Sequence, residues 1–250
     1  MKNLLLALMT VLAFVSVPAQ SQSVASLSAK LTNAAGRPDA DKARDMGRKP
    51  ADVVTFLGIK PGMTVIDLYA AAGYYTEVLS HAVGSSGKVY MQNSPSALTG
   101  RRGPQTVEAI DARLANNRLS NVEKITVAPD SLGLAANSVD AAVIALEFHE
   151  LYLSDNPNAV ADFLAEIRRV LKPGGVLGIV EHSGSFSVDP GPLHRALESQ
   201  VVADAQAAGF FVGKGSDVLR NINDDMFVMV FDPSIRGKTD RFVLKLVQKR

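Results

Sequence analysis

The 250-residue sequence predicts an α/β fold in which helices cover both faces of a mostly parallel sheet. Three observations support this prediction. Short, β-branched apolar runs alternate with longer segments whose apolar residues have helical spacing. Turns rich in glycine and proline separate these segments. Near the C-terminus two strand-like runs follow each other with no convincing helix between them, which indicates an antiparallel closing pair.

The predicted strands are short apolar runs bounded by turn residues, as buried parallel strands are. In chain order they cover residues 64–68, 88–92, 124–127, 139–146, 176–181, 227–231 and 241–247. The predicted helices cover residues 41–57, with a break at Pro50, and then 74–83, 106–116, 159–171 and 193–208. Alternation at this spacing requires right-handed crossovers between parallel strands.

The N-terminus has the three-part layout of a secretory signal peptide. Lys2 precedes an almost entirely apolar run over 4–17, and Ala19 is followed by the polar run 20–23. We expect cleavage after Ala19 and export out of the cytoplasm, either periplasmic or secreted. The alternative is a membrane anchor, but a span needs about 20 apolar residues. Residues 20–40 are interpreted as a leader and 41–250 as a single domain, with no membrane span after cleavage.

Composition excludes several classes of function. Removing Lys2 leaves 25 basic and 25 acidic residues, so the balance gives no reason to expect a nucleic-acid partner. The chain has no cysteine, which excludes disulfides, thiol nucleophiles and cysteine-bound metals. The four histidines are scattered along the sequence, and we therefore expect no metal site.

The first predicted strand leads into a loop of small residues. Ligands of open α/β sheets bind beyond the carboxyl ends of the strands. In 67–76 the run Ala70-Ala71-Ala72-Gly73 lets a ligand approach the backbone, and the helix that follows offers unpaired N–H groups. Gly73 is the only glycine of this loop, so the dinucleotide fingerprint G-x-G-x-x-G is absent. An NAD-dependent oxidoreductase is therefore disfavoured.

Polar residues directly follow three further predicted strands. They are Gln92-Asn93-Ser94, Glu147-Phe148-His149-Glu150 and Glu181-His182-Ser183. Each histidine taken alone is as well explained by a hydrogen-bonded position at the rim of the sheet. Together, His149, Glu150 and His182 are candidates for general acid–base chemistry because their side chains gain and lose protons.

These segments resemble the S-adenosylmethionine-dependent methyltransferases of class I. The loop 67–73 resembles their first motif, Asp-Leu-Gly-x-Gly-x-Gly, and 88–93 resembles the second strand with its ribose-binding end. The most specific match is Glu-Ile-Arg-Arg-Val-Leu-Lys-Pro-Gly-Gly over 166–175. The exported leader and the segment 232–238 further resemble a group of exported bacterial methyltransferases. The resemblance implies a seven-stranded Rossmann-like sheet with an antiparallel C-terminal strand.

The resemblance also implies a role for individual residues. Asp67 and the loop that contains Tyr69, Ala71 and Gly73 would hold the methionine part of S-adenosylmethionine. Asn93 would face the ribose, and Asp130 and Ser131 would lie near the adenine. Residues from Glu147 to Glu150 would border the point of methyl transfer.

The chain departs from the family pattern at three of these positions. Tyr69 and Ala71 replace glycines, and the Tyr69 ring either turns away or fills cofactor space. Asn93 stands where an acidic residue normally accepts hydrogen bonds from both ribose hydroxyls. An uncharged amide with one oxygen would cost about 1–2 kcal/mol, or about tenfold in affinity.

Two hypotheses of function follow. The first is methyl transfer to a small or surface-bound acceptor outside the cytoplasm, with His149 or His182 as the base. The second is an inactive binding module that retains the fold. His194 and Arg195, on the last predicted helix, are further candidates for contact with the acceptor. Arg236 either faces an anionic acceptor or lies in a solvated hairpin.

Overall fold

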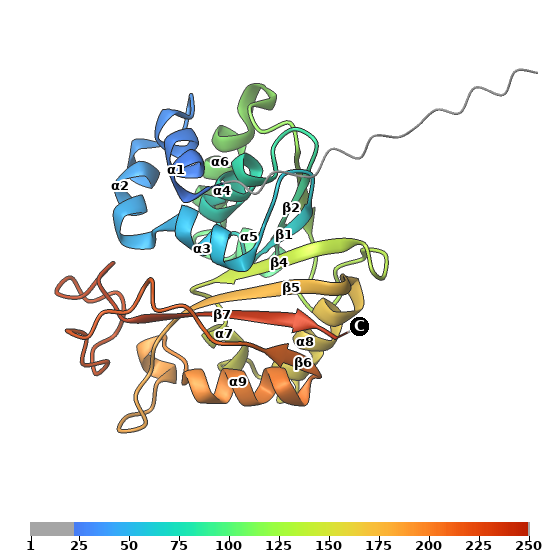
Figure 1. Cartoon of the computed structure of the whole chain (residues 1–250). Coiled ribbons are helices and arrows are strands. Elements are labelled where there is room, and N and C mark those ends of the chain that lie inside the picture. The colour runs from blue at the N-terminus through green and yellow to red at the C-terminus, as the bar shows by residue number, and fades with distance from the viewer. Residues whose placement is uncertain (1–22, 250) are drawn as a thin grey trace, which may run out of the picture.

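A computed structural model describes residues 23–249 and contains one mixed sheet of seven strands (Figure 1). The strand order is β3-β2-β1-β4-β5-β7-β6, and all pairs are parallel except those that β7 makes with β5 and β6. The strands are β1 (Thr64–Leu68), β2 (Lys88–Asn93), β3 (Val122–Thr126), β4 (Val139–Ala145), β5 (Leu171–His182), β6 (Phe210–Val212) and β7 (Arg241–Gln248). This arrangement confirms the predicted fold class.

Helices cover both faces of the sheet, with α1, α3 and α4 on one face and α8 and α9 on the other (Figure 1). The α-helices are α1 (Val24–Asn33), α2 (Asp39–Arg48), α3 (Pro50–Leu57), α4 (Tyr74–Val83), α5 (Pro95–Thr99), α6 (Gly103–Leu114), α7 (His149–Tyr152), α8 (Ala159–Val170) and α9 (Glu198–Ala207). Two short 3-10 helices, η1 (Ala115–Asn117) and η2 (Gly191–Leu193), complete the described chain. The predicted break at Pro50 is confirmed, because Pro50 is the first residue of α3.

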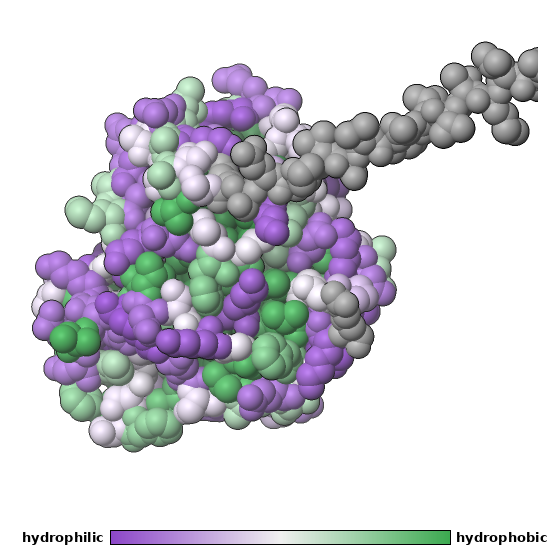
Figure 2. All heavy atoms as spheres, viewed as in Figure 1, coloured by the Kyte–Doolittle hydropathy of each residue, from purple (hydrophilic) through white to green (hydrophobic). Residues whose placement is uncertain are grey.

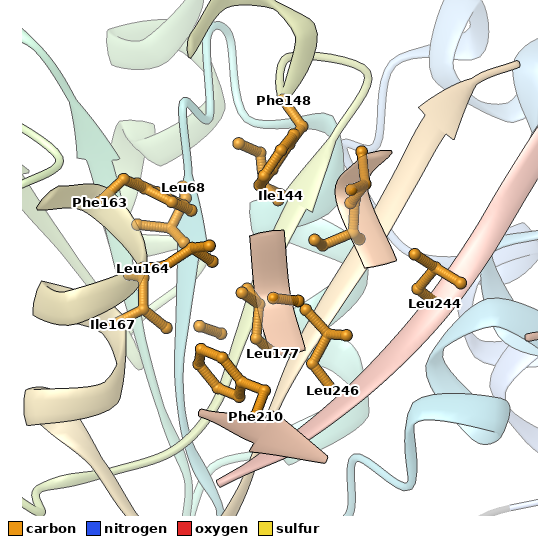
Figure 3. Close-up of a cluster of buried hydrophobic side chains, with 14 of the residues drawn as sticks. Leu68, Ile144, Phe148, Phe163, Leu164, Ile167, Leu177, Phe210, Leu244 and Leu246 are labelled. Atoms are coloured by element: carbon orange, nitrogen blue, oxygen red, sulfur yellow. The ribbon is translucent and has the colours of Figure 1, made fainter. Parts of the chain in front are cut away.

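The apolar core between the sheet and α8 extends to the carboxyl ends of the strands (Figure 3). Leu68 ends β1, and Phe148 follows β4; both are fully buried. The Phe148 ring packs edge-on against Phe163 of α8 at a centroid distance of 5.9 Å. This packing fixes the backbone immediately before His149, so the polar residues that follow β4 begin from a rigid point.

The segment 20–40 is not a plain leader, because most of its described part belongs to the fold. It contains α1, whose Leu27 and Leu31 are each 1% exposed and pack against α3 and α4. Arg37 is also buried, and its guanidinium pairs with Asp45 of α2. The expected signal peptide, residues 1–19, lies outside the described residues. Within 23–249, no helix has the length and apolarity that a membrane span requires.

The predicted strand at 227–231 is wrong. Its outward side chains, Phe227 and Met229, do alternate with inward ones such as Val230, as in a strand. However, the segment lies along a loop, where Val230 N–H donates to the Leu193 carbonyl at 3.3 Å. The strand that precedes β7 is β6, directly after α9. The sequence pattern shows alternation, but it does not show which backbone lies alongside.

The predicted helix 193–208 begins only at Glu198. Before it, His194 has a left-handed φ of 54°, which ends η2 and turns the chain. The resulting loop 183–197 and the loop 213–240 both project beyond the carboxyl end of the parallel strands, at the left in Figure 1. These two loops form one side of the sheet edge at which ligands are expected to bind, beyond the carboxyl ends of the parallel strands.

Candidate active site

The loop between β1 and α4 keeps the backbone of a glycine-rich loop although it has one glycine. Tyr69 and Ala71 have φ values of 51° and 48°, and Gly73 has φ 84°. A left-handed conformation costs a non-glycine residue about 1–2 kcal/mol, so the surrounding structure must enforce it. At Gly73 a methyl group would lie 2.8 Å from Met91 Cε and 3.0 Å from Arg113 Cδ. Steric contact therefore adds to the backbone requirement at the one position that remains glycine.

Two amide side chains from the end of β2 hold this loop in place. Gln92 Oε1 accepts the Tyr69 N–H at 2.9 Å. Asn93 Oδ1 accepts the Ala71 N–H at 2.8 Å, while its Nδ2 donates to the Ala71 carbonyl at 3.2 Å. Both polar groups of the Asn93 side chain thus bind the loop, and its expected contact with the ribose stays a prediction. An aspartate could not make the second of these bonds, because it has no donor.

Asp67 is buried at the start of the loop and accepts a hydrogen bond from Thr76 Oγ1 at 2.6 Å. Burial raises the pKa of this carboxyl to about 7, against the opposing effect of the Thr76 hydrogen bonds. Asp67 lines a pocket beside the loop, and its expected contact with the methionine part of the cofactor stays a prediction. The hydrogen bond to α4 also links the end of β1 to the helix whose N-terminus faces the edge at which ligands are expected to bind.

A pocket of about 160 Å³ lies against the loop. Its walls come from α2, the loop, the start of α4 and the end of β4, and its lining residues are Arg44, Arg48, Asp67, Leu68, Tyr69, Ala70, Ala71, Ala72, Tyr74, Tyr75, Ala145, Leu146 and Glu147. Typical sites for small molecules measure about 300–1,000 Å³. The volume therefore suits the amino-acid end of the expected cofactor. Tyr69 stands in the wall between the pocket and the apolar core, so its ring takes up space that glycine would leave open.

Arg48 is the feature of the pocket that sequence reasoning missed. Its guanidinium carbon lies 4.4 Å from the centroid of the Tyr74 ring, and it makes no hydrogen bond or ion pair within residues 23–249. Burial lowers the pKa of this guanidinium, and the raising effects of Tyr75, Tyr74 and Asp41 do not outweigh it. Such a cation in a pocket is suited to an anionic group of a ligand. The signal in the sequence was a basic residue in the last turn of α2, which is a common feature of helices.

Asp130 and Ser131 do not line this pocket. Both are exposed after β3, and Asp130 lines a separate shallow hollow beside α8. Their predicted position near the adenine stays a prediction. Glu147, by contrast, does line the pocket and has no side-chain hydrogen bond or ion pair within residues 23–249. Burial raises the pKa of its carboxyl to about 7.

A cluster of polar side chains continues from Glu147 toward the projecting loops. His149 Nε2 lies 3.2 Å from both His194 Nδ1 and Glu150 Oε1, and His194 Nδ1 lies 3.0 Å from the same oxygen. On its other side His149 Nδ1 is 3.1 Å from Glu181 Oε1, off the direction of its N–H. The structure thus brings His149 and Glu150 together as predicted, and adds His194, which is 45 residues away from His149 in the sequence.

The two histidines predicted as bases have opposite protonation. Burial lowers the pKa of His149, but Glu150 and Glu181 outweigh that effect and raise it to about 10. Burial and the nearby Arg241 lower the pKa of His182 to about 2, while its Nδ1 contacts Thr239 Oγ1 at 2.7 Å. His149 therefore keeps its proton at neutral pH, and His182 is too weak a base to take one. Neither value is that of a general base, which works best with a pKa near the operating pH.

Arg195 does not line the crevice in which the acceptor is expected, but is buried among the two projecting loops. It is 1% exposed, lies before α9 rather than on it, and donates to Asp224 Oδ2 at 2.8 Å and to the Ser183 carbonyl at 2.9 Å. Its function is to join the two projecting loops. Arg236 is exposed in a turn in which its N–H donates to the Asp232 carbonyl at 2.9 Å, as in the solvated hairpin.

Comparison with known proteins agrees with this architecture. Residues 73–179 match the sequence profile of a family described as "Methyltransferase domain". The ubiquinone/menaquinone biosynthesis C-methyltransferase UbiE of Klebsiella pneumoniae is 26% identical over 180 residues, which cover 72% of this chain and 65% of that enzyme. The chain thus spans just under two thirds of the length of the curated relatives it matches.

Solved structures share the fold. A SAM-dependent methyltransferase from Aquifex aeolicus is 28% identical, with a TM-score of 0.59 over 80% of this chain and 89% of that one. The [4+2]-cyclase SpnF has the same TM-score at 18% identity, over 81% of each chain, and shows the fold alone. Over residues 73–179 the chain is thus similar to a methyltransferase domain, and its sheet order and the Aquifex relative agree with the fold of the S-adenosylmethionine-dependent methyltransferases.

Proposed function

We propose that the chain transfers the methyl group of S-adenosylmethionine to an oxygen or acidic carbon of a small apolar acceptor, and that it does so outside the cytoplasm. The observation that carries this proposal is one pocket with two unpaired charged groups, Arg48 and Glu147, beside the β1–α4 loop. When bound, the cofactor supplies an electrophilic methyl group on a sulfonium centre.

Arg48 is the residue best placed to bind the cofactor. The methionine part carries a carboxylate, and Arg48 is the pocket cation without a carboxylate of its own, whereas Arg44 pairs with Asp41. The loop backbone between Tyr69 and Gly73 forms the adjoining wall. These residues fit an amino-acid group of opposite charge, which supports their role as the methionine site.

Glu147 is the residue best placed to receive a proton. It lines the same pocket, and the next polar residues along the chain are His149 and Glu150 on the acceptor side. In the proposed reaction, the acceptor O–H or C–H proton passes to the Glu147 carboxylate. Bound S-adenosylmethionine would supply the methyl group to the electron pair so released and would leave as the neutral thioether. Holding the acceptor atom in line with the methyl group supplies most of the rate acceleration in a transfer of this kind.

The rim of the acceptor side supports an apolar acceptor. Large apolar side chains of the two projecting loops are exposed there, namely Phe186 (82%), Ile222 (97%), Phe227 (49%), Met229 (42%) and Phe231 (51%). Figure 2 shows green apolar residues among purple polar ones over this end of the molecule. Phe231 packs against His194 of the polar cluster, and exposed apolar side chains on these loops can bind an apolar ligand. The name of the Klebsiella relative, which refers to quinone biosynthesis, suggests a quinol as acceptor.

The test uses the mature chain from Gln20 onward. A hundredfold excess of S-adenosylmethionine over its Kd should add about 2.7 kcal/mol of stability, or roughly 5–10 °C in Tm. Labelled methyl transfer is then measured to a reduced quinone that lacks a ring methyl group. Glu147→Gln should lower kcat by about 100-fold or more while the cofactor Kd stays the same. Glu108→Gln, on the exposed face of α6, is the matched control.

An inactive binding module is the second candidate, favoured by the altered residues Tyr69 and Ala71. SpnF, a [4+2]-cyclase, shows that this fold is found in a protein named for another reaction. A Tm shift with the cofactor, but no labelled product with quinols or with an extract of envelope lipids and proteins, would favour the module. No shift at millimolar cofactor would overturn methyl transfer altogether.

Export is tested separately. The proposal rests on the layout of residues 1–19, with Lys2, the apolar run and Ala19. Fusion of this segment to a reporter that folds only in an oxidising compartment should give an active reporter and a shortened product. A fusion with Leu5→Arg and Leu6→Arg should stay inactive and uncleaved.

A further inference from the structure

We propose that His149, Glu150 and His194 bind one divalent transition-metal ion on the acceptor side of the pocket. The three side chains offer one ligand atom each, and these atoms form a nearly equilateral triangle with edges of 3.2, 3.2 and 3.0 Å. Sequence patterns do not reveal this site, because two ligands are adjacent after β4 and the third lies in the loop after β5.

The size of the triangle matches the ligands of a metal. Nitrogen and oxygen ligands lie about 2.0–2.2 Å from Zn²⁺, so two of them are about 3.0 Å apart at an octahedral ion and about 3.4 Å apart at a tetrahedral one. The observed edges of 3.0–3.2 Å fall in or at the edge of this range. The ligand atoms therefore need little movement to surround an ion.

Hydrogen bonds account for only two of the three edges of this triangle at a time. Each ring nitrogen carries either one proton or one lone pair, and the Glu150 carboxylate only accepts. If both nitrogens are protonated, two N–H groups face each other along the 3.2 Å edge between the rings. If one is protonated, its single N–H serves only one of its two edges. An ion just above the plane of the triangle would displace the ring protons and accept a lone pair from all three atoms at once.

The surroundings of His149 resemble the outer sphere of a metal ligand. Glu181 lies 3.1 Å from the Nδ1 of His149, opposite the nitrogen that faces the triangle, as a negative charge behind the ring that lies off the direction of the Nδ1–H. Its two oxygens accept the backbone N–H groups of His149 at 3.1 Å and His182 at 2.7 Å, so the carboxylate is fixed. A carboxylate behind a histidine that binds a metal orients the ring and increases its basicity.

His194 is held in the triangle by a backbone that its residue type disfavours. Its φ of 54° is left-handed, which points to an enforced position. Its ring lies edge-on to His149 at 5.2 Å, and Phe231 packs against it at 4.9 Å. The two projecting loops thus fix the third ligand. Binding of an ion by Nδ1 would offset the energetic cost of the left-handed conformation.

The site is closed on one side and open on the other. The His149 side chain is 4% exposed, whereas those of Glu150 and His194 are 39% and 30% exposed. An ion bound here would keep coordination positions toward solvent, as catalytic metal sites do. Two imidazoles with one carboxylate favour Zn²⁺, Co²⁺, Fe²⁺ or Ni²⁺ over Ca²⁺. If the proposed function holds, an acceptor oxygen is the group that would take an open position.

The test measures metal binding directly, without the cofactor or an acceptor. The tag-free mature chain is dialysed against a chelator and titrated with Zn²⁺ by calorimetry and with Co²⁺ by visible absorption. We expect one ion per chain with Co²⁺ bands typical of nitrogen ligands. His194→Ala and Glu150→Gln should each weaken binding at least tenfold, and Glu181→Gln about 10–100-fold.

His81→Ala is the matched control, because it removes one histidine on α4, outside the triangle. Circular dichroism checks that each variant is folded. Glu150 and His194 are substituted instead of His149 because their side chains are partly exposed, so their replacement disturbs the fold less. No binding by the wild type at about 1 mM ion would overturn the inference. Equal loss in His81→Ala and His194→Ala would also overturn it. The Tm shift with S-adenosylmethionine is measured separately, so failure of the metal site and failure of the proposed function are distinct results.

Discussion

The cofactor side of the pocket is built from segments close in sequence, whereas the acceptor side combines segments far apart. On the cofactor side β1, the loop and α4 follow each other directly, and β2 supplies the two amides that hold the loop. On the acceptor side, α7 meets a loop after β5 and a second loop before β7. The difference explains why the family resemblance concerns one side and the histidine cluster lies on the other.

The two sides also differ in how they are stabilised. Arg113 of α6 lies under the cofactor loop, is buried, and joins α2, α4 and the loop through Asp41, Glu77 and the Ala72 carbonyl. The acceptor side has its own buried pair, Arg195 with Asp224, but its rim is apolar and exposed. We infer that the cofactor side is rigid and that substitutions on the acceptor rim change recognition more than stability.

The largest effect is expected from breaking the network under the cofactor loop. Arg113→Ala leaves Glu77 and Asp41 buried with fewer partners, and should lower the free energy of unfolding by about 3–5 kcal/mol. Urea unfolding measures this change. Arg169→Ala, which breaks a half-exposed pair with Glu166, should cost less than about 1 kcal/mol. Similar losses in both variants would contradict the proposed contrast.

The next effect concerns the pocket itself. Arg48→Ala should weaken binding of S-adenosylmethionine by about 10–100-fold, because a charge-assisted hydrogen bond contributes about 1.5–3 kcal/mol. Calorimetry measures the Kd. Lys42→Ala on the same helix pairs only with the exposed Asp39 and should leave the Kd unchanged. An unchanged Kd in Arg48→Ala would place the carboxylate elsewhere.

Substitution of Asn93 distinguishes two interpretations of the residues at the end of β2. If its amide holds the loop, Asn93→Asp loses the bond to the Ala71 carbonyl, lowers stability by about 1–3 kcal/mol and does not tighten cofactor binding. If Asn93 instead faces the ribose when the cofactor binds, the same variant should bind it about tenfold more tightly. Asn116→Asp, at an exposed left-handed position, is the control for the change of charge.

The smallest effect on stability is expected at the acceptor rim. Phe227→Ser with Met229→Ser should change the free energy of unfolding by less than about 1 kcal/mol, because both side chains are substantially exposed. The kcat/KM for the quinol should fall roughly 3- to 10-fold through lost apolar contact. Phe211→Ser, on β6 at the opposite end of β7, should leave kcat/KM unchanged. A large loss of stability would mean that the rim belongs to the core.

Most of the fold could be predicted from local sequence patterns, and the errors of that prediction have physical causes. The five parallel strands were predicted nearly at their observed positions because buried strands are short apolar runs between turns. The residues 227–231 have the alternation of a strand but no neighbouring strand, and α1 was missed because its small polar residues resemble a linker. Pairing and docking are long-range interactions that a local pattern does not report.

The sequence by itself determined the class of fold, the position of the loop after β1 and the presence of ionisable residues at the strand ends. Periodicity and turn residues are local properties, so they are visible in one chain. Only the tertiary structure decided that Asn93 binds the loop, that Arg48 faces the pocket unpaired, and that His194 meets His149 and Glu150. These outcomes depend on the left-handed turn at His194, on burial and on the docking of distant loops, which only the folded chain defines.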